Sequence, residues 1–301
     1  MVHPVLILSP WILIFVSVVS LLGNGTILIT VIKNRFLRQT DCLYLIAALA
    51  VADFITAVST IPYSVNMIVH NYENCTVGST LGTVAGHIGG IRMNQMITLF
   101  LGLDRLYALF WPYKYRLKNQ ATIARYATAF SAFMGATYMF FLIGHDLSRV
   151  MNTCNLMTAL KETPALRVYR LFLTTVTTLA TQVVYIIVFY KLRRIISAQD
   201  NEVAKARYHS ANATITLLLV SSLLFMTLPS IVNLYDYLSS SGIFLVYGPL
   251  ISIVNIINGA VNVFIYSWAH KDFNKAIKSL FKCHNATVGP STAAFFVKHT
   301  L

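Results

Sequence analysis

The sequence contains few charged residues. Only 11% of its 301 residues are Asp, Glu, Lys or Arg, whereas 56% are hydrophobic, and the mean hydropathy is +0.66. A soluble globular domain carries about a quarter charged residues. The composition therefore predicts a membrane protein and excludes an ordinary soluble domain.

Cysteine and clustered metal ligands are scarce as well. The four Cys residues are too few and too scattered for a disulfide scaffold or a zinc cluster. A zinc hydrolase would need clustered His, whereas His87, His145 and His209 fall at different depths of the predicted membrane segments. We therefore expect neither a metal centre nor catalytic residues, and no enzyme activity.

The sequence has no removable leader of the usual kind. No region rich in Lys or Arg precedes the first apolar run, and no small-residue cleavage site follows it. No internal repeat or low-complexity tract is visible. We expect the first membrane helix to act as its own insertion signal.

Seven apolar runs are long enough to cross a bilayer as helices, which takes about 20 residues each. They predict an all-α fold, a single membrane domain made of a seven-transmembrane-helix bundle. The runs lie at about residues 10–32, 42–69, 79–110, 121–144, 168–192, 208–238 and 245–268.

A short amphipathic stretch follows the seventh run, at residues 271–282. Its apolar side chains fall on one helical face and its lysines on the other, which is typical of a helix lying on the membrane surface. We therefore predict a short eighth helix there, in contact with anionic lipid. Residues 283–301 are expected to form a flexible tail.

The basic residues are distributed unevenly between the two sides of the membrane. The chain has 23 Lys and Arg against 10 Asp and Glu, a net charge of +13. Eighteen of the bases lie in the loops and tail on one side and four on the other, with Arg92 inside the third helix. Because cytoplasmic loops carry the excess of bases, the amino terminus should be outside and the carboxyl terminus in the cytosol. This distribution argues against a nucleic-acid partner.

Polar residues within the apolar runs are candidate functional residues, because they are costly in hydrocarbon. Asp53 lies in the middle of the second run and needs polar partners. Asn residues of the bundle are the candidates, although they could also serve only to bind helices together. The candidates are Asn24, Asn94, Asn258 and Asn262, the last two one turn apart on one face.

The stretch from Gly102 to Tyr115 carries the most specific pattern. Asp104-Arg105-Leu106 ends the third apolar run, Pro112 follows seven residues after the Arg, and Tyr115 three residues after the Pro. This pattern resembles the end of the third helix of rhodopsin-like (class A) G protein-coupled receptors. The Leu and the Trp-Pro-Tyr-Lys-Tyr continuation are most similar to the nematode serpentine chemoreceptors of the Srsx type.

Other helices share features with this family. Gly23-Asn24 and the Leu-x-x-x-Asp pattern at Asp53 match its first two helices, and Asn94 stands where its members line a water or sodium pocket with Asp53. Asn262 and Tyr266 resemble its Asn-Pro-x-x-Tyr motif, with Val263 in place of the Pro. The resemblance implies a polar core whose hydration changes on activation, with a sodium ion as the one candidate cofactor.

The sixth helix resembles the family only in part. Pro229 matches the family's kink proline, and Thr227 replaces the Trp two residues earlier. The fourth helix lacks the family's Trp and the fifth its central Pro.

The resemblance implies that an inner site receives a heterotrimeric G protein. Its residues would be Asp104, Arg105, Pro112, Tyr115, Arg193, Arg194, Asn262 and Tyr266.

On the outer side, the resemblance implies a disulfide between Cys75 and Cys154. Family members place the first of these cysteines a few residues closer to the Arg than Cys75 stands. Asn74 lies in a glycosylation sequon next to Cys75. Cys283 follows the amphipathic stretch and is a candidate for palmitoylation, although a plain exposed thiol is an alternative.

The candidate ligand pocket lies in the outer half of the bundle. His87 and Ile91 share a face of the third helix, and His87 is about 27 Å from Arg105 along the helix. Arg92 is buried at a similar height and needs an anion, supplied either by the protein (Asp146 or Asp236) or by a ligand. Tyr235 and Asp236 form a candidate pocket wall or an interfacial belt.

These features lead to one main functional prediction. We expect a plasma-membrane receptor that binds an extracellular small or odorant-like molecule and activates a heterotrimeric G protein. A neuropeptide receptor of the same fold is the alternative, and a transporter or channel subunit is the alternative from another class. A light receptor is excluded because the seventh helix has no Lys for a retinal Schiff base.

Overall fold

The computed structural model describes residues 4–34, 43–137, 147–161, 164–198, 216–240, 243–269, 274 and 276–278. Nearly all of these residues are helical. Because hydrocarbon offers no hydrogen-bond partners, a spanning backbone has to satisfy its own polar groups, which a helix does. In chain order the helices are α1 (Pro4–Lys33), α3 (Leu43–Val69), α4 (Val77–Phe110), α5 (Pro112–Leu117), α6 (Gln120–Ala136), α7 (Leu156–Lys161), α8 (Pro164–Ser197), the π-helical turn η2 (Leu223–Thr227), α10 (Leu228–Ser239) and α11 (Ile243–Ala269).

Five helices in the described part of the chain are long and apolar enough to cross a membrane. They are Ile7–Lys33, Tyr44–Val69, Pro164–Ser197, Thr216–Ser239 and Gly248–Trp268. The fourth of these contains η2 and α10. Large apolar side chains on the outer faces, such as Phe15, Phe172 and Phe264, are about 70% exposed, as expected for a surface covered by lipid.

The helix α4 is less apolar than these five because it is surrounded by other helices. It packs against α3, α6 and α8. Polar side chains along it, including Arg92, Asn94 and Gln95, are therefore buried among neighbouring helices instead of in lipid. With 34 residues, α4 is about 50 Å long, more than enough to cross a bilayer.

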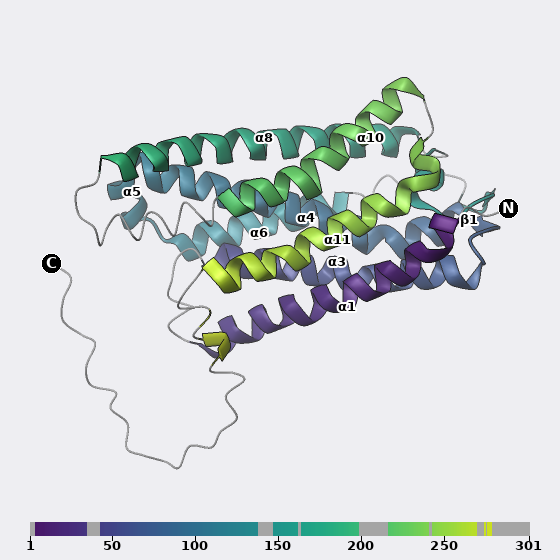
Figure 1. Cartoon of the computed structure of the whole chain (residues 1–301), viewed down its shortest axis with the longest axis horizontal. Helices are drawn as coiled ribbons and strands as arrows, with labels where there is room; N and C mark the ends of the chain where they lie inside the picture. The colour runs from purple at the N-terminus through teal and green to yellow at the C-terminus, as the bar shows by residue number, and fades with distance from the viewer. Residues whose placement is uncertain are drawn as a thin grey trace, which may run out of the picture.

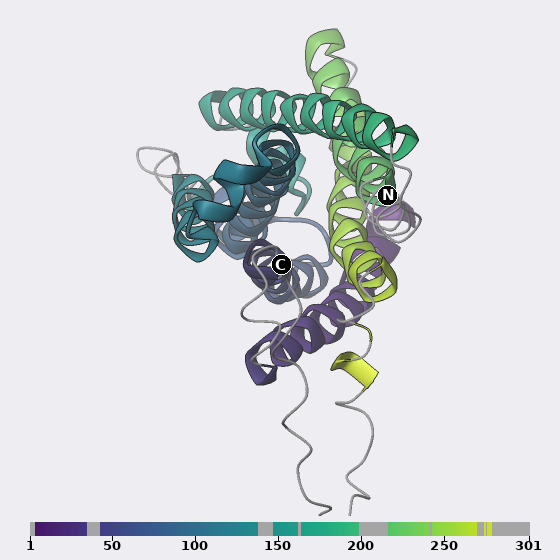
Figure 2. The same ribbon diagram turned by 90° about the vertical axis from the view of Figure 1, so that its left-hand side faces the viewer.

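The helices run roughly along one direction, and the two ends of the bundle differ. Figure 1 shows β1 (Cys75–Thr76) and the start of α1 at one end and α5 at the other. The nearly end-on view in Figure 2 shows α11 between α1 and the segment formed by η2 and α10, in agreement with its contacts. We call the β1 end the outer end and the α5 end the inner end, after the orientation predicted from the sequence, and the two candidate sites lie at these opposite ends.

Small residues bring α4 close to its neighbours. A Cβ atom added to Gly90 would lie 2.3 Å from Thr56 Oγ1 and 2.9 Å from the Thr56 nitrogen on α3. A Cβ atom on Gly135 of α6 would lie 2.6 Å from the carbonyl oxygen of Gly89. Close backbone approach through small residues is a common way for membrane helices to associate.

A short pair of antiparallel strands and a disulfide close the outer end. Cys75 pairs with Met151, and Thr76 with Val150, in an antiparallel ladder between β1 and β2 (Val150–Met151). Cys75 and Cys154 form a disulfide with their Cα atoms 5.2 Å apart. Both cysteines are buried. The segment from Val150 to Cys154 is thereby fixed to the start of α4.

The apolar core has two parts. The inner part contains Ile46, Ile97 and Tyr266, and the outer part contains Tyr63, Leu81 and Ile256. Buried polar residues of α3, α4 and α11, centred on Asp53, lie between the two parts along these helices. The polar layer therefore separates an outer half of the bundle from an inner half.

The observed helix bounds differ from the predicted runs mainly at the ends. The helix predicted at 168–192 extends from Pro164 to Ser197, because basic residues such as Arg193 and Arg194 continue the helix beyond the apolar part. The helix predicted at 10–32 begins at Pro4. The ends of the runs predicted at 121–144 and 208–238 lie partly outside the described residues, as do the tail at 283–301 and most of the surface helix at 271–282.

Candidate functional site

Asp53 is the centre of the polar layer. It is buried on α3 and accepts a hydrogen bond through Oδ1 from Asn94 Nδ2 of α4. Its Oδ2 atom lies 3.4 Å from Asn262 Nδ2 of α11, which donates to it. Thr98 Oγ1 in turn lies 3.5 Å from Asn94 Oδ1. One carboxyl group thus joins three helices that are far apart in the sequence.

The other two predicted members of this polar core bond elsewhere. Asn24 donates to the carbonyl oxygen of Ser20 at 3.0 Å and lies 3.5 Å from the carbonyl oxygen of Gly259 on α11. Asn258 accepts a hydrogen bond from Ser221 at 3.0 Å. These two Asn residues connect α11 to α1 and to the helix that contains η2, and neither hydrogen-bonds to Asp53.

At the inner end, Asp104 is held by two residues. Arg105 Nη2 lies 3.2 Å from Asp104 Oδ2, and the Tyr115 hydroxyl donates to the same oxygen at 3.2 Å. Tyr115 belongs to α5, which begins at Pro112, a favoured first residue because its fixed φ suits a helix start. The pattern seen in the sequence therefore becomes a contact between the end of α4 and the short helix that follows.

Aromatic side chains near this contact make cation–π contacts with basic side chains. The Lys118 ammonium lies 4.5 Å from the centre of the Tyr107 ring, and the Lys191 ammonium lies 4.9 Å from that of Phe110. Arg193 stacks over Phe189 at 5.0 Å, and Arg194 is exposed in the last turn of α8. Cation–π contacts of this kind keep bases at a surface without a carboxylate partner.

Two further inner-half residues of the prediction lie on α11. Asn262 belongs to the polar layer, and Tyr266, one turn nearer the inner end, is buried in the inner core. Val263 stands between them and packs against Gly23 of α1, where a Cβ atom would lie 2.9 Å from a Val263 methyl group. The position that is Pro in the family motif is used here for helix contact.

The sixth membrane helix contains a π-helical turn directly before Pro229. In η2 the backbone N–H of Leu228 donates to the carbonyl oxygen of Leu223, five residues earlier. Gln182 Nε2 of α8 donates to Ser222 Oγ and to Thr227 Oγ1, both at 2.9 Å. One side chain of α8 therefore bridges the start and the end of the π turn, at the position where the family resemblance would place a Trp.

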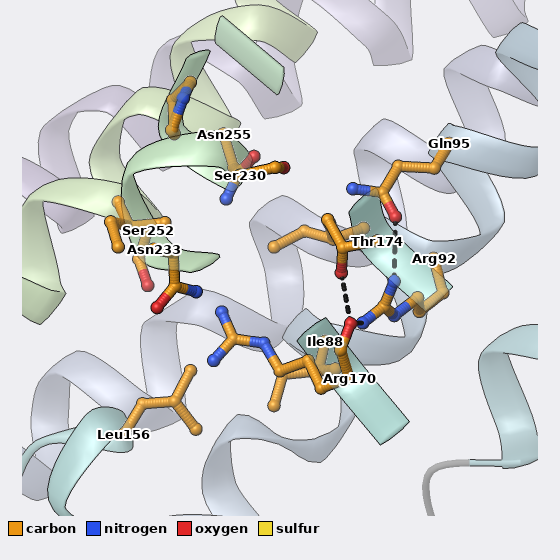
Figure 3. Close-up of a pocket in the computed structure, with 13 residues that line it drawn as sticks. Ile88, Arg92, Gln95, Leu156, Arg170, Thr174, Ser230, Asn233, Ser252 and Asn255 are labelled. Atoms are coloured by element: carbon orange, nitrogen blue, oxygen red, sulfur yellow. Dashed lines mark hydrogen bonds between the residues drawn. The ribbon is translucent and has the colours of Figure 1, made fainter. Parts of the chain in front are cut away.

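A cavity opens between α4, α8, α10 and α11 in the outer half of the bundle. Its volume is small, about 30 Å³, close to that of one water molecule. It is lined by residues of these helices and by Leu156 of α7, and Figure 3 shows most of their side chains. The lining residues are Ile88, Ile91, Arg92, Gln95, Leu156, Arg170, Thr174, Pro229, Ser230, Asn233, Ile251, Ser252 and Asn255.

Arg92 is the buried cation of this cavity. Its Nη1 donates to Gln95 Oε1 at 3.1 Å, and its Nη2 donates to the carbonyl oxygen of Arg170 at 2.5 Å. The Thr174 hydroxyl donates to the same carbonyl oxygen at 2.6 Å. Figure 3 shows these bonds and shows the Arg170 side chain extending toward Asn233. Two guanidinium groups therefore reach the same cavity.

The five residues predicted for the ligand pocket have different positions. Ile91 and Arg92 line the cavity. His87 does not, because it is fully buried against α3, where its Nδ1 lies 2.8 Å from Thr60 Oγ1 and its ring stacks on Tyr63. Tyr235 is 65% exposed on the outer face of α10, and Asp236 is buried but lies outside the lining.

Most of the polar residues that line the cavity were not predicted from the sequence. Ser230 and Asn233 are three residues apart on α10, as are Ser252 and Asn255 on α11. That spacing places each pair on one helix face, so a search for polar pairs at helical spacing could have found them. Arg170 was counted among the outer-loop bases although it lies near the start of the helix predicted at 168–192, and the structure places it on α8.

Asn74 is exposed and has a left-handed backbone conformation with φ of 59°. Asp146, one proposed partner of Arg92, and Cys283 lie outside the described residues. Arg92 makes its hydrogen bonds with the neutral groups of Gln95 and Arg170, not with Asp236.

Part of the chain is similar in sequence to known receptors. Over 111 residues, 33% of the chain, the sequence is 33% identical to the melatonin receptor type 1A of Mus musculus. Over 110 residues, 32% of the chain, it is 32% identical to the melatonin receptor type 1A of Gallus gallus. The aligned part spans 31% of each of these relatives, less than a third of their length.

A sequence family matches nearly the whole chain. Residues 17–281 match the family described as serpentine type 7TM GPCR chemoreceptor Srsx. The match includes the polar layer, the Asp104-Arg105 end of α4, the disulfide and the outer cavity. The family predicted from the sequence is therefore confirmed. This protein belongs to the Srsx family of serpentine seven-transmembrane G protein-coupled chemoreceptors and is a receptor, not an enzyme.

Proposed function

We propose that this protein is a multi-pass plasma-membrane receptor that binds an extracellular small molecule in the outer cavity and activates a heterotrimeric G protein at the inner end. Seven helices would cross the membrane, with α4 and α6 completing the five that are apolar enough by composition. The amino terminus would be extracellular and the carboxyl terminus cytoplasmic. The uneven distribution of bases supports this orientation.

The observation that carries the proposal is the bonding of Asp53 to α4 and α11. Both helices also line the outer cavity, and α4 carries Arg105 near its inner end. A ligand that favours another arrangement of these helices shifts the population toward it. The Asp53 layer lies between the two ends, so a change in its hydrogen bonds would accompany the shift.

At the inner end, release of Arg105 from Asp104 would be the activating step. A helix of the G protein would then meet Arg105, the aromatic surface of α5 and the bases Arg193 and Arg194. The present contact of Asp104 with both Arg105 and Tyr115 is consistent with a resting state. The lysines predicted on the surface helix at 271–282 would bind anionic inner-leaflet lipid.

A sodium ion near Asp53 fits the chemistry of the layer. A carboxylate with amide and hydroxyl oxygens nearby offers the hard oxygen ligands that such an ion prefers. Asp53 Oδ1 and Oδ2, Asn94 and Thr98 would supply these ligands. In this role the ion would stabilise the resting arrangement of α3, α4 and α11.

The small and enclosed cavity favours a small ligand over a neuropeptide. Pockets that bury small molecules are concave and mostly apolar, with a few polar groups that set orientation. The relatives found by comparison are named after the small molecule melatonin. For this chain we propose only that the ligand is likewise a small molecule.

Nucleotide exchange in membranes from expressing cells tests the proposal. Membranes are mixed with purified G protein heterotrimers, and binding of a non-hydrolysable GTP analogue is measured without ligand and with panels of small odorants and amidated peptides. Arg105→Ala should abolish receptor-dependent exchange. Arg125→Ala is the matched control, because Arg125 is exposed and bonds within its own helix, to Ala121 O and Thr122 Oγ1.

Two results would contradict the proposal. Exchange that is unaffected by Arg105→Ala would exclude this residue from coupling. An epitope at the carboxyl terminus that antibodies reach on intact cells would reverse the proposed orientation. Stimulation only by amidated peptides would favour the neuropeptide alternative.

A further inference from the structure

Within the described residues, Arg92 is a buried charge whose two hydrogen-bond partners are neutral. Only 4% of its surface is exposed, and its hydrogen bonds go to the Gln95 side chain and to a backbone carbonyl oxygen. Within the described part of the chain, no carboxylate lies within salt-bridge distance of it. Removing one charge from water without a counterion costs several kcal/mol, so this arrangement is costly for the protein alone.

The surroundings of Arg92 would not repel an anion. The thirteen residues that line the cavity include two arginines and no Asp or Glu. The backbone of Arg170 accepts from Arg92, and its side chain extends across the cavity toward Asn233 (Figure 3). Each guanidinium offers donors only, and the amide groups of Gln95, Asn233 and Asn255 can add further N–H donors.

Another part of the lining is apolar. Ile88, Leu156 and Ile251 line the same cavity. A ligand that fits both parts would carry a compact negative head and an apolar body. A charged hydrogen bond from a guanidinium to a carboxylate is roughly twice as strong as a neutral one, and a bidentate pair also fixes the orientation of the head group.

We propose that the ligand of this cavity is a small organic anion, with a carboxylate or similar head group bound by Arg92. The inference rests on the proposed function, because it assigns a ligand class to the same receptor. Arg92 would be the main counterion, and Gln95 would hold its guanidinium in place. The cavity would have to enlarge to admit the apolar body.

A thermal-shift experiment on the purified full-length receptor tests the ligand class. The probes are benzoate, indole-3-acetate and decanoate, each compared with its own primary amide, which has nearly the same shape without the charge. The expected result is a higher melting temperature with at least one carboxylate and no change with its amide. Arg92→Gln should weaken that response at least about tenfold.

Arg92→Lys and Arg167→Gln complete this set. Lysine keeps the charge but loses the planar fork, so Arg92→Lys should retain part of the response. Arg167, which stacks over Tyr237 and is not in the cavity lining, is the control, and its variant should respond as the wild type does. Equal responses to acid and amide, an unchanged response in Arg92→Gln, or no response to any of the three acids would overturn the proposal.

The stability of the ligand-free receptor gives a second and independent measurement. If Arg92 is kept for a ligand, Arg92→Met removes an uncompensated buried charge and should raise the melting temperature without ligand. If Arg92 mainly holds α4 to α8, the same variant should lower it. Asp146→Asn should leave it unchanged, and a matching loss in both variants would identify Asp146 as the counterion instead.

The two proposals fail in different ways. Carboxylate-specific stabilisation without any Arg105-dependent nucleotide exchange would retain the anion site and contradict the proposed coupling. Exchange that depends on Arg105 but responds equally to neutral ligands would retain the receptor function and contradict the anion site.

Discussion

Gly259 of α11 packs directly against the carboxyl group of Asp53. A Cβ atom at position 259 would lie 2.9 Å from Asp53 Cγ and 2.9 Å from Oδ1, closer than real Cβ contacts. The carbonyl oxygen of the same glycine lies 3.5 Å from Asn24 Nδ2 of α1. A residue without a side chain thus allows α1, α3 and α11 to meet at the polar layer.

Gly259→Ala should therefore destabilise the receptor. The added methyl group has to displace either the Asp53 carboxyl group or α11, and overpacking of this kind costs about 1–3 kcal/mol. We expect a lower melting temperature of the purified protein. Gly82→Ala of α4 is the control, because a Cβ atom there meets nothing within 4 Å. Equal melting temperatures for the two variants would contradict the close packing.

Asp53→Asn should remove any stabilisation by sodium. The substitution keeps the size of the side chain but removes the negative charge that a cation needs. We expect wild-type protein to melt at a higher temperature in sodium chloride than in choline chloride of equal ionic strength, and Asp53→Asn to melt alike in both. A sodium effect that survives the substitution would place the ion elsewhere.

The structure joins three of the five residues predicted for the polar core, whereas most of the polar lining of the outer cavity was not predicted. Polar residues are rare in apolar runs because burying them in hydrocarbon is costly. That rarity is why the sequence pointed to Asp53, Asn94 and Asn262. The position of Asn233 and Asn255 in the cavity depends instead on how α10 and α11 rotate against α4. Rotation is set by packing between helices, which a single apolar run does not specify.

Asp104→Asn should raise signalling without ligand. The substitution removes the negative charge 3.2 Å from Arg105 Nη2 and leaves the guanidinium easier to expose. Tyr115→Phe removes only the hydroxyl that donates to Asp104, so it should have a smaller effect in the same direction. Nucleotide exchange without ligand measures both. A fall in exchange for both variants would indicate that the Asp104 contact belongs to the active arrangement.

Loss of the disulfide should weaken the outer end of the receptor. Replacing either Cys75 or Cys154 by Ser breaks a link across 79 residues of sequence, and loss of a native disulfide typically costs about 2–5 kcal/mol. We expect a similar fall in melting temperature for each single variant. The double variant should lose little more than either single one, since both remove the same bond. Additive losses would argue against the pairing.

Gln182→Leu should alter the π-helical turn. Leucine cannot donate to Ser222 and Thr227, so both hydroxyl groups lose the donor that joins the two ends of η2. Each hydroxyl group still donates to a backbone carbonyl oxygen, so the loss is that of two hydrogen bonds, about 0.5–1.5 kcal/mol each. Hydrogen exchange of residues 222–228 in the purified protein should become faster. Gln182→Glu, which cannot donate from a carboxylate, should act in the same direction, and an unchanged exchange rate in both would show that the turn is held by the backbone alone.

The π turn also shows why some features escape a sequence analysis. Pro229 predicted a bend, and the structure has a π-helical turn directly before it. Gln182, which bridges the two ends of the turn, lies on another helix and was not singled out from the sequence. The disulfide was predictable despite the unusual spacing of Cys75, because only two cysteines fall on the outer side.

The close crossings at Gly89, Gly90 and Gly135 have a mechanical consequence. Backbone atoms of α3, α4 and α6 touch where other helices are held apart by side chains, so these three helices can neither slide nor rotate against one another without collision. We therefore expect these three helices to move little against one another, and we expect movement that carries a signal to take place in the helix containing η2 and in its neighbours α8 and α11.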